Sequence, residues 1–161
     1  MKVFNKKTAP WLLLSTGLLL IDLLTKKWAE TALAPVETMP LVEGIIGLRY
    51  AENTGAAFSA FAGATVWLSL ISLAVCTVVL VYVVRHPEMG RLEHLSLSMV
   101  LSGGIGNLID RIARGYVVDF FEFQFVDFAV FNFADIFITV GAALLFIALL
   151  RGGEIHARVE N

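Results

Sequence analysis

Long stretches without charged side chains dominate this sequence. Residues 58–84 contain no Asp, Glu, Lys or Arg, and about 20 apolar residues in a helix are enough to cross the hydrocarbon core of a bilayer. Three further stretches, 10–25, 95–109 and 130–150, are nearly as apolar, and two of them contain a single acidic residue. We therefore predict a mainly α-helical integral membrane protein with four transmembrane helices, over residues 10–27, 64–84, 93–110 and 130–150.

Composition supports the same class. Hydrophobic residues make up 58% and charged residues 16% of the chain, with a mean hydropathy of +0.79, whereas soluble domains carry about 25% charged residues. The net charge of −2 argues against a nucleic-acid partner, which would require a strongly basic face. The single cysteine, Cys76, excludes a disulfide framework and a cysteine metal cluster. We expect one membrane-embedded domain over residues 1–161.

Four spans place both termini on one side of the membrane. That side carries seven of the twelve Lys and Arg residues, so the positive-inside rule predicts cytoplasmic termini. A cleaved signal peptide is the alternative for the first span, because residues 32–34 (Ala-Leu-Ala) are typical of a cleavage site. Pro35 directly after that site, and Lys26 and Lys27 before it, favour a retained anchor instead.

The two external loops, about residues 28–63 and 111–129, are too long to be simple helix connections. Both contain strand-like runs, at 45–51 and 116–128, and seven of the twelve phenylalanines lie between Phe120 and Phe133. Aromatic clusters beside a span suit the headgroup level of a membrane. We predict a small external β-sheet that rests on the membrane.

Ionisable groups inside a span are costly, so each is a candidate for function. Asp22 has Lys26 four residues later on the same helical face, which favours a structural ion pair. Asp135 has no such local partner. Counted from residue 130, it lies about 7–8 Å inside its span at 1.5 Å per residue. Asp135 could serve only to form a structural hydrogen bond between helices, but we favour a role in the reaction.

Two carboxyls that share a proton can hydrolyse a peptide bond, because one activates water while the protonated partner polarises the carbonyl. Asp119, alone in an apolar strand-like stretch, and Asp110, at the end of the third span, are both possible partners for Asp135. Asn107 and Asn132 each precede a carboxyl by three residues and could position a polar ligand or cross-link helices. A dyad of Ser59 and Lys26 is conceivable but lacks a nucleophile elbow. Neither a metal site nor a cofactor motif is visible in the sequence.

Five blocks of residues, in this order, resemble those of the lipoprotein signal peptidases, or signal peptidase II, which are bacterial intramembrane aspartyl proteases. The resemblance covers nearly the whole chain. The blocks are Asp22-x-x-x-Lys26, Asn53-Thr54-Gly55-Ala56-Ala57-Phe58-Ser59, Gly106-Asn107-x-x-Asp110-Arg111, Gly115-x-Val117-x-Asp119-Phe120 and Phe131-Asn132-x-Ala134-Asp135.

The resemblance implies that Asp119 and Asp135 are the catalytic pair and that Asp110 belongs to a structural ionic group. It also implies that further polar or small residues bind substrate or shape the site: Asn53, Gly55, Asn107, Arg111 and Asn132. The implied fold is four helices with an external sheet cradle and a short interfacial helix.

The implied substrate is a diacylglyceryl-modified prolipoprotein, cut just before its lipidated cysteine at the outer face of the bacterial inner membrane. The implied inhibitor is the cyclic peptide globomycin. Membrane lipids are further partners, and no cofactor is implied. Two other functions remain open: a small proton-coupled transporter that uses Asp22 and Asp135, and a non-catalytic subunit of a membrane assembly.

Overall fold

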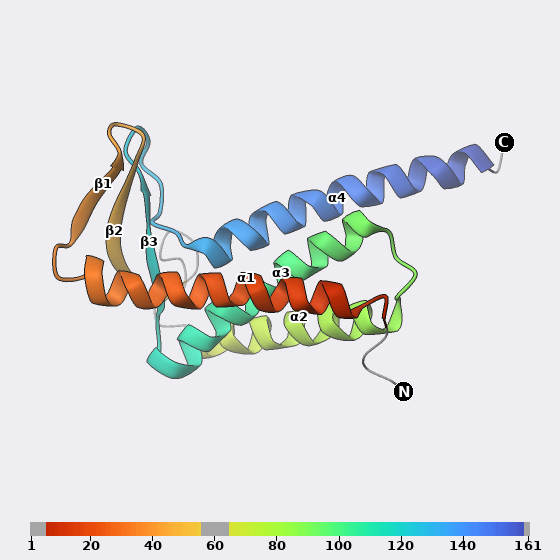
Figure 1. Ribbon diagram of the computed structural model, residues 1–161, viewed down its shortest axis with the longest axis horizontal. Coiled ribbons are helices and arrows are strands. Elements are labelled where there is room, and N and C mark those ends of the chain that lie inside the picture. Colours follow the sequence, from red (N-terminus) through yellow and green to blue (C-terminus); the bar gives the residue numbers. More distant parts are fainter. Residues whose placement is uncertain (1–5, 56–64, 160–161) are drawn as a thin grey trace.

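The computed structural model describes residues 6–55 and 65–159, with side chains up to residue 151 in the last helix. Its four long helices are α1 (Ala9–Trp28), α2 (Thr65–Arg85), α3 (Arg91–Arg114) and α4 (Phe133–Val159). A three-stranded sheet lies at one end of these helices, and both termini lie at the other end (Figure 1). We call the end with the strands the sheet end of the bundle.

Three of the described helices are long and apolar enough to cross a membrane: Ala9–Leu33, Thr65–Arg85 and Phe133–Arg151. The remaining predicted span, 93–110, coincides with α3, which is a continuous helix but does not meet the same criterion of apolarity. The reason is its position, because α3 packs against α1, α2 and α4. A helix that faces protein on several sides can carry buried serines such as Ser96, Ser98 and Ser102 in place of apolar residues.

Two helix ends differ from the prediction. Helix α3 continues through Arg111 to Arg114, where Gly115 ends it with a φ of +82° that side chains rarely adopt. The external loop predicted from residue 111 therefore begins four residues later. Helix α4 begins at Phe133 rather than at residue 130, so Asp135 lies in its first turn and not the predicted 7–8 Å inside the helix.

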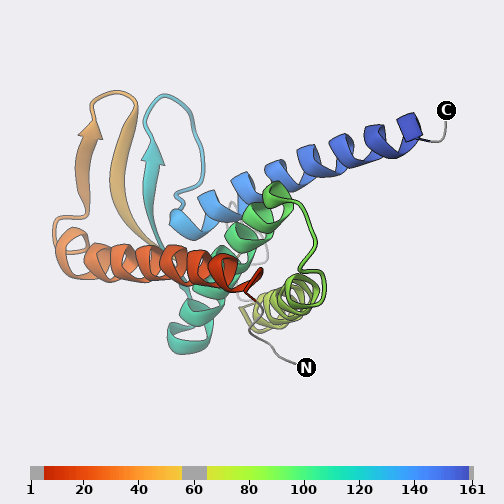
Figure 2. The ribbon, with the colours of Figure 1, turned by 45° about the vertical axis from the view of Figure 1, so that its right-hand side comes forward.

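The sheet is antiparallel with strand order β1-β2-β3, and its strands are Thr38–Val42, Ile46–Asn53 and Val117–Phe123 (Figure 2). The predicted strand at 45–51 corresponds to β2. The predicted strand at 116–128 is right only for its first half, since the chain leaves the sheet after Phe123. Strand β1 was not predicted, because Pro40 lies in its middle and proline usually argues against a strand. Proline is tolerated there because β1 is at the edge of the sheet.

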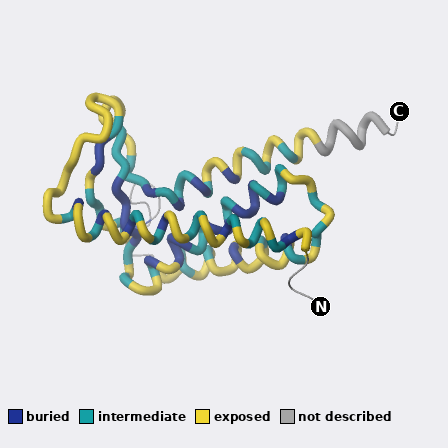
Figure 3. Tube along the Cα trace, viewed as in Figure 1, coloured by how far each residue is buried: buried dark blue, intermediate teal, exposed yellow. Residues whose placement is uncertain are grey.

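The sheet packs on the end of α1 through a small apolar core. This core joins Leu48, Val118 and Phe120 of the strands to Ala29 and Leu33, which lie in a π-helical turn (Ala29–Leu33) that continues α1. Buried residues gather on α3 and where the strands meet the helices, whereas α2 is largely exposed (Figure 3). The fold thus excludes solvent most strongly at the junction of sheet and bundle.

The resemblance also implies a short interfacial helix. Among residues 6–55 and 65–159, the π-helical turn is the only short helical element near the sheet, and it continues α1 without a break. The predicted span start at residue 64 and the motif residues 56–59 lie outside the described residues.

Candidate active site

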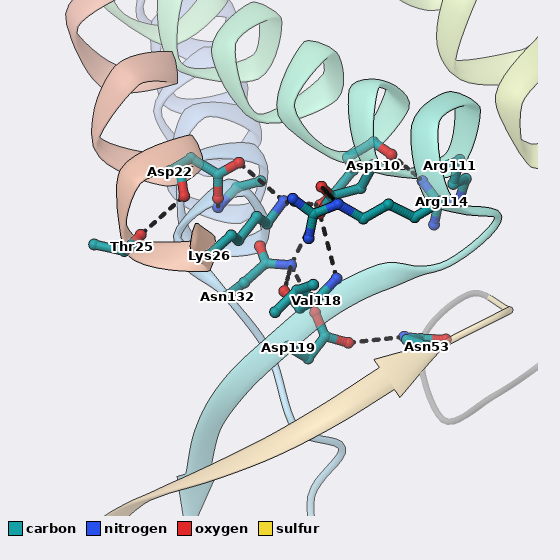
Figure 4. Close-up of polar contacts among 12 residues, drawn as sticks. Asp22, Thr25, Lys26, Asn53, Asp110, Arg111, Arg114, Val118, Asp119 and Asn132 are labelled. Atoms are coloured by element: carbon teal, nitrogen blue, oxygen red, sulfur yellow. Dashed lines mark hydrogen bonds and ion pairs between the residues drawn. The ribbon is translucent and has the colours of Figure 1, made fainter. Parts of the chain in front are cut away.

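All ten predicted site residues lie together at the junction of the sheet and the helices, and most of them are labelled in Figure 4. Helix α1 contributes Asp22 and Lys26, and α3 contributes Asn107, Asp110 and Arg111. Asp119 comes from β3, Asn53 and Gly55 come from the end of β2 and the residues after it, and Asn132 and Asp135 come from the start of α4. Elements far apart in the sequence thus converge on one polar cluster.

Asn132 and Asp135 cap the first turn of α4. Oδ1 of Asn132 accepts a hydrogen bond from the backbone N–H of Asp135 at 3.0 Å, and Oδ2 of Asp135 accepts one from the backbone N–H of Asn132 at 3.1 Å. This reciprocal arrangement is a capping box, with Asp135 at the third helical position. The Asn-x-x-Asp spacing in the sequence is therefore explained by the start of the helix.

Asp119 is buried and lies between two amides. Its Oδ1 accepts from Nδ2 of Asn132 at 2.6 Å, and its Oδ2 accepts from Nδ2 of Asn53 at 3.0 Å. Burial, followed by the negative charge of Asp135, raises the pKa of Asp119 from 3.8 to about 7. The carboxyl can therefore keep a proton near neutral pH, as a general acid must.

Asn107 connects Asp135 to Lys26. Its Nδ2 donates to Oδ1 of Asp135 at 2.8 Å, while its Oδ1 accepts from Nζ of Lys26 at 2.9 Å. Oδ1 of Asn107 also accepts from Nδ2 of Asn132 at 3.2 Å. The two amides and the two catalytic candidates therefore form one hydrogen-bonded network.

Lys26 is the buried cation of the cluster, with 1% of its side chain exposed. Its Nζ lies 2.9 Å from Oδ2 of Asp22 and 3.1 Å from Oδ2 of Asp110, both of which are also buried. Oδ1 of Asp22 accepts from the backbone N–H of Ala134 at 2.9 Å and so helps to cap α4. The predicted ion pair of Asp22 and Lys26 is confirmed, and it joins three helices.

Arg111 and Asn53 hold the chain that follows β2. Nη2 of Arg111 donates to the carbonyl of Gly55 at 3.2 Å, and Oδ1 of Asn53 accepts from the backbone N–H of Gly55 at 2.9 Å. Because Nδ2 of Asn53 donates to Asp119, this one side chain ties the turn at Gly55 to the acidic pair. Gly55 therefore contributes backbone groups to the site.

A cavity of about 460 Å³ opens beside the network, and both Asp119 and Asp135 line it. Asn53, Asn107, Arg111 and Thr139 provide the rest of its polar wall. The remaining wall is apolar and comes from β3, the following loop and α4. It includes Phe123, Phe128, Phe131, Ile136, Ile138 and Val140.

Sequence reasoning missed the outer part of the ionic group. Arg114 is paired with Glu30 and lies 3.7 Å from Oδ1 of Asp110, while the backbone N–H of Val118 donates to Asp110 at 3.3 Å. The four-residue spacing from Asp110 to Arg114 is a signal that could have revealed this pair. Asp110 thus has cationic and backbone partners on α1, α3 and β3.

One alternative catalytic group cannot be placed, and the histidines lie elsewhere. Ser59, the nucleophile of the serine–lysine hypothesis, lies outside the described residues. His94 is buried near the start of α3, where its ring stacks on Trp11 with centroids 5.3 Å apart, and His86 follows the end of α2. Of the three histidines, His86 and His94 belong to the end of the bundle opposite the sheet, and the side chain of His156 lies outside the described residues.

Comparison with known proteins places this geometry in a family. The family model described as signal peptidase (SPase) II matches residues 14–151. Proteins named lipoprotein signal peptidase are similar over most of the chain. The relative from Nostoc sp. is 43% identical over 81% of this chain and 83% of its own length, and the relative from Streptococcus pyogenes serotype M1 is 40% identical over 82% and 87%.

The fold is similar to that of solved bacterial membrane enzymes. One of them, determined by the in meso method at 2.3 Å resolution, has a TM-score of 0.83 and 25% identity, covering 89% of this chain and 88% of that one. A second, at 1.9 Å resolution, has a TM-score of 0.80 and 25% identity, covering 88% and 93%. The sequence matches and the shared fold agree, and the chain belongs to the signal peptidase II family of membrane peptidases.

Proposed function

We propose that this peptidase is an intramembrane aspartic endopeptidase that removes the signal peptide from diacylglyceryl-modified prolipoproteins, just before the lipidated cysteine. The observation that carries the proposal is that Asp119 and Asp135 line one cavity, each oriented by amide side chains of the same network. Hydrolysis of a peptide bond by water can be catalysed by two carboxyls, one of which has a raised pKa, and Asp119 has such a pKa.

The reaction needs no covalent intermediate with the enzyme. One carboxylate of the pair accepts a proton from water as the water oxygen attacks the scissile carbonyl. The protonated partner donates to the carbonyl oxygen and stabilises the tetrahedral intermediate. Arg111, on the same cavity wall, adds positive charge near the developing oxyanion.

The apolar wall supports a lipidated, membrane-borne substrate. Three phenylalanines, Phe123, Phe128 and Phe131, line the cavity together with Ile136 and Val140. Such a wall can contact the apolar segment of a signal peptide or the acyl chains of the modified cysteine, and two acyl chains would hold that cysteine at the headgroup level. The inhibitor globomycin would occupy the same cavity.

We place the chain in the bacterial inner membrane with four spans, α3 being the innermost. At 1.5 Å per residue, the 24 residues of α3 extend about 36 Å, which is enough to cross the hydrocarbon core. Both termini would then be cytoplasmic, and the sheet end would form a cradle at the outer surface. The positive-inside bias and the position of both termini at one end support this orientation.

Membership of a peptidase family favours hydrolysis over the transporter and assembly alternatives. The structure also weighs against Asp22 as a proton carrier. Asp22 is fully buried, paired with Lys26 and bonded to the backbone of Ala134, so its charge is already committed to the fold.

The test is a gel-shift cleavage assay with the full chain in detergent, with a diacylglyceryl-modified prolipoprotein and its unlipidated form as substrates. We expect the wild type to cut only the lipidated form, and both Asp119→Asn and Asp135→Asn to abolish cleavage. Asp127→Asn, an exposed acid in the loop after β3, is the matched control and should cut normally.

Full activity in either Asn variant of the pair would refute the dyad and make Asp110 the next candidate. Equal cleavage of both substrates would refute lipid recognition. A folded wild type that cuts neither substrate would refute the proposed function, and proton flux in liposomes would then test the transporter.

A further inference from the structure

In the proposed mechanism, one aspartate of the pair must be ionised to act as the base, and the other must be protonated to act as the acid. We infer that Asp119 holds this proton while Asp135 holds the charge, and that buried Lys26 is a positioning residue that enforces the division through Asn107. The inference rests on the proposed function in that it assigns acid and base within the same pair. It adds a role for Lys26 beyond joining helices.

The orientation of Asn107 follows from the chemistry of Lys26. An ammonium group has three donors and no acceptor, and the three partners within reach of Nζ are Asp22, Asp110 and Oδ1 of Asn107. The oxygen of the amide must therefore face Lys26. Its NH₂ group is then directed at Oδ1 of Asp135, which is 2.8 Å away. Asp135 consequently faces a donor that favours its charged form.

The start of α4 favours charge on the same residue. Asp135 is the third residue of the helix, and its Oδ2 accepts the backbone N–H of Asn132. An anion at this position interacts favourably with the positive end of the helix dipole. Asp135 thus receives one backbone donor, one donor oriented by a cation, and the dipole of α4.

Asp119 has none of these three influences. It lies on a strand, and both of its donors are side-chain amides, from Asn53 and Asn132. Nδ2 of Asn132 is shared, because it also faces Oδ1 of Asn107 at 3.2 Å and the carbonyl of Val118 at 3.3 Å. A protonated carboxyl still accepts both bonds, so the network is compatible with a neutral Asp119. Its pKa of about 7, raised by burial and by Asp135, agrees with this assignment.

The other charged groups around the pair do not reverse the assignment. Asp22 and Asp110 are neutralised by Lys26, and Asp110 also lies near Arg114. Arg111 lines the cavity with both catalytic candidates and so favours negative charge on either of them. The charge of Lys26 also lowers the pKa of Asp119, but burial and the charge of Asp135 outweigh it. What distinguishes Asp135 from Asp119 is therefore the helix start and the Lys26–Asn107 contact.

The assigned roles balance over one turnover. Asp135 takes a proton from water as the water oxygen bonds to the carbonyl carbon, and Asp119 gives its proton to the carbonyl oxygen. The neutral tetrahedral intermediate then collapses. The C–N bond breaks, Asp135 returns its proton to the amine nitrogen, and one hydroxyl proton of the intermediate returns to Asp119. The pair ends as it began.

Infrared spectroscopy of the full chain in liposomes tests the proton assignment without any substrate. We expect the wild type to show a buried protonated carboxyl band that titrates near pH 7. The band should be absent from Asp119→Asn. It should persist in Asp135→Asn with a lower midpoint, because the negative charge that helps to raise the pKa of Asp119 is gone.

Loss of the band in Asp135→Asn with retention in Asp119→Asn would overturn the assignment. A band unaffected by both variants, or no band between pH 5 and 8, would overturn it as well. Because the spectra need no cleavage, a failure of the proposed function is seen separately. In that case the band would follow Asp119 while the lipidated substrate stays uncut.

The role of Lys26 is tested in the Asp119→Asn background, where no band is expected. Adding Lys26→Met should make carboxyl bands appear, but Asp22 and Asp110 also lose their cation in this variant and contribute to these bands. The band of Asp135 is the part that disappears when Asp135→Asn is added. If Lys26→Met does not fold, Asn107→Leu in the Asp119→Asn background removes the same donor, keeps the cation, and should also produce a band that Asp135→Asn removes. Bands that Asp135→Asn leaves unchanged would overturn the positioning role.

Cleavage kinetics give a second readout in the Asp119-containing enzyme. Lys26 does not line the cavity, so Lys26→Met should lower kcat at least tenfold while KM stays within about twofold. Asn107→Leu should lower kcat as much, and the double variant should be no worse than Asn107→Leu alone, because the two residues act in series. Multiplied losses in the double variant would contradict the inference.

Discussion

Nδ2 of Asn132 lies 2.6 Å from Oδ1 of Asp119, while Oδ1 of the same amide caps the first turn of α4. One side chain therefore anchors a helix and orients a catalytic candidate. The backbone N–H of Asp135 donates to Oδ1 of Asn132, so the NH₂ group of Asn132 is directed at Asp119. The start of α4 and the electrostatics of the acidic pair depend on the same residue.

The two roles of Asn132 are separable by substitution. Serine is as good an N-cap as asparagine but has no NH₂ group to donate to Asp119. We expect Asn132→Ser to keep the cap, to lower the free energy of unfolding by about 1–3 kcal/mol because buried acceptors lose their donor, and to lower cleavage at least tenfold. Thermal unfolding in detergent and the gel-shift assay measure the two effects.

Asn132→Ala is the matched control, because it removes the cap as well. It should be about 1 kcal/mol less stable than Asn132→Ser, with a similar cleavage defect. Wild-type cleavage by Asn132→Ser would mean that Asp119 does not depend on this donor.

The raised pKa of Asp119 predicts how activity and stability change with pH. The carboxyl has a pKa of about 7 in the folded protein and about 3.8 when unfolded, so folding favours its protonated form. As pH rises through 7, the folded protein loses this proton. Cleavage should therefore fall by up to about tenfold per pH unit above pH 7. The free energy of unfolding should fall earlier, by up to about 1.4 kcal/mol per unit between about pH 4 and 7, and level off above pH 7, where the carboxyl is ionised in both states.

The control for this pH dependence is the stability of Asp119→Asn between pH 4 and 9. Asparagine does not titrate, so the decline in stability between about pH 4 and 7 should be reduced in this variant but retained in Asp127→Asn. Parallel pH curves for wild type and Asp119→Asn would show that another group is responsible.

Much of this site could be predicted from sequence, because ionisable side chains inside a membrane span cost free energy and therefore stand out. Asp22 and Asp135 interrupt apolar runs, and such groups are retained only where they are paired or used. The sequence could not choose between Asp110 and Asp119 as the partner of Asp135 without the family resemblance. That choice depends on the position of β3 beside the start of α4 and on the ion pair between Lys26 and Asp110. Both are contacts between residues far apart in the sequence, so no local pattern reveals them.

The errors in the predicted fold have similar causes. Helix α4 begins at Phe133 instead of residue 130 because Asn132 caps it. The capping box of Asn132 and Asp135 was not recognised because the residues around it are apolar. Helix α3 is too polar to be identified as a span by hydropathy alone, since its serines and glycines face other helices. Strand β1 contains a proline and no alternating pattern, so nothing local marks it as a strand.

Gly106 is predicted to be irreplaceable for a packing reason. A Cβ at this position would collide with the Asp22 carboxylate and touch Ala134 at 3.6 Å. Gly106→Ala should therefore cost about 1–3 kcal/mol of stability, measured by thermal unfolding in detergent.

Gly17→Ala is the matched control for this substitution, because a Cβ there meets nothing within 4 Å and the residue lies inside α1. It should be neutral or stabilise by up to about 1 kcal/mol. Similar effects of the two substitutions would mean that α1 and α4 do not approach α3 closely at Gly106.

Asp22 and Glu30 illustrate the difference between buried and exposed ion pairs on α1 and its continuation. Asp22 is fully buried, and its carboxylate contacts both Lys26 and the backbone of Ala134, so Asp22→Asn removes a charge that the interior depends on. We expect a loss of about 2–4 kcal/mol in the free energy of unfolding. Lys27 pairs with Glu30 at 3.2 Å but is 66% exposed, so Lys27→Ala should cost no more than about 0.5 kcal/mol.

Salt distinguishes these two pairs further, because mobile ions screen exposed charges and hardly reach buried ones. The small effect of Lys27→Ala should vanish when the unfolding experiment is repeated at about 1 M salt, whereas the effect of Asp22→Asn should persist. If the Asp22 effect also disappeared at high salt, water and ions would have access to Lys26. The inference that Lys26 orients Asn107 from a dry, fixed position would then fail with it.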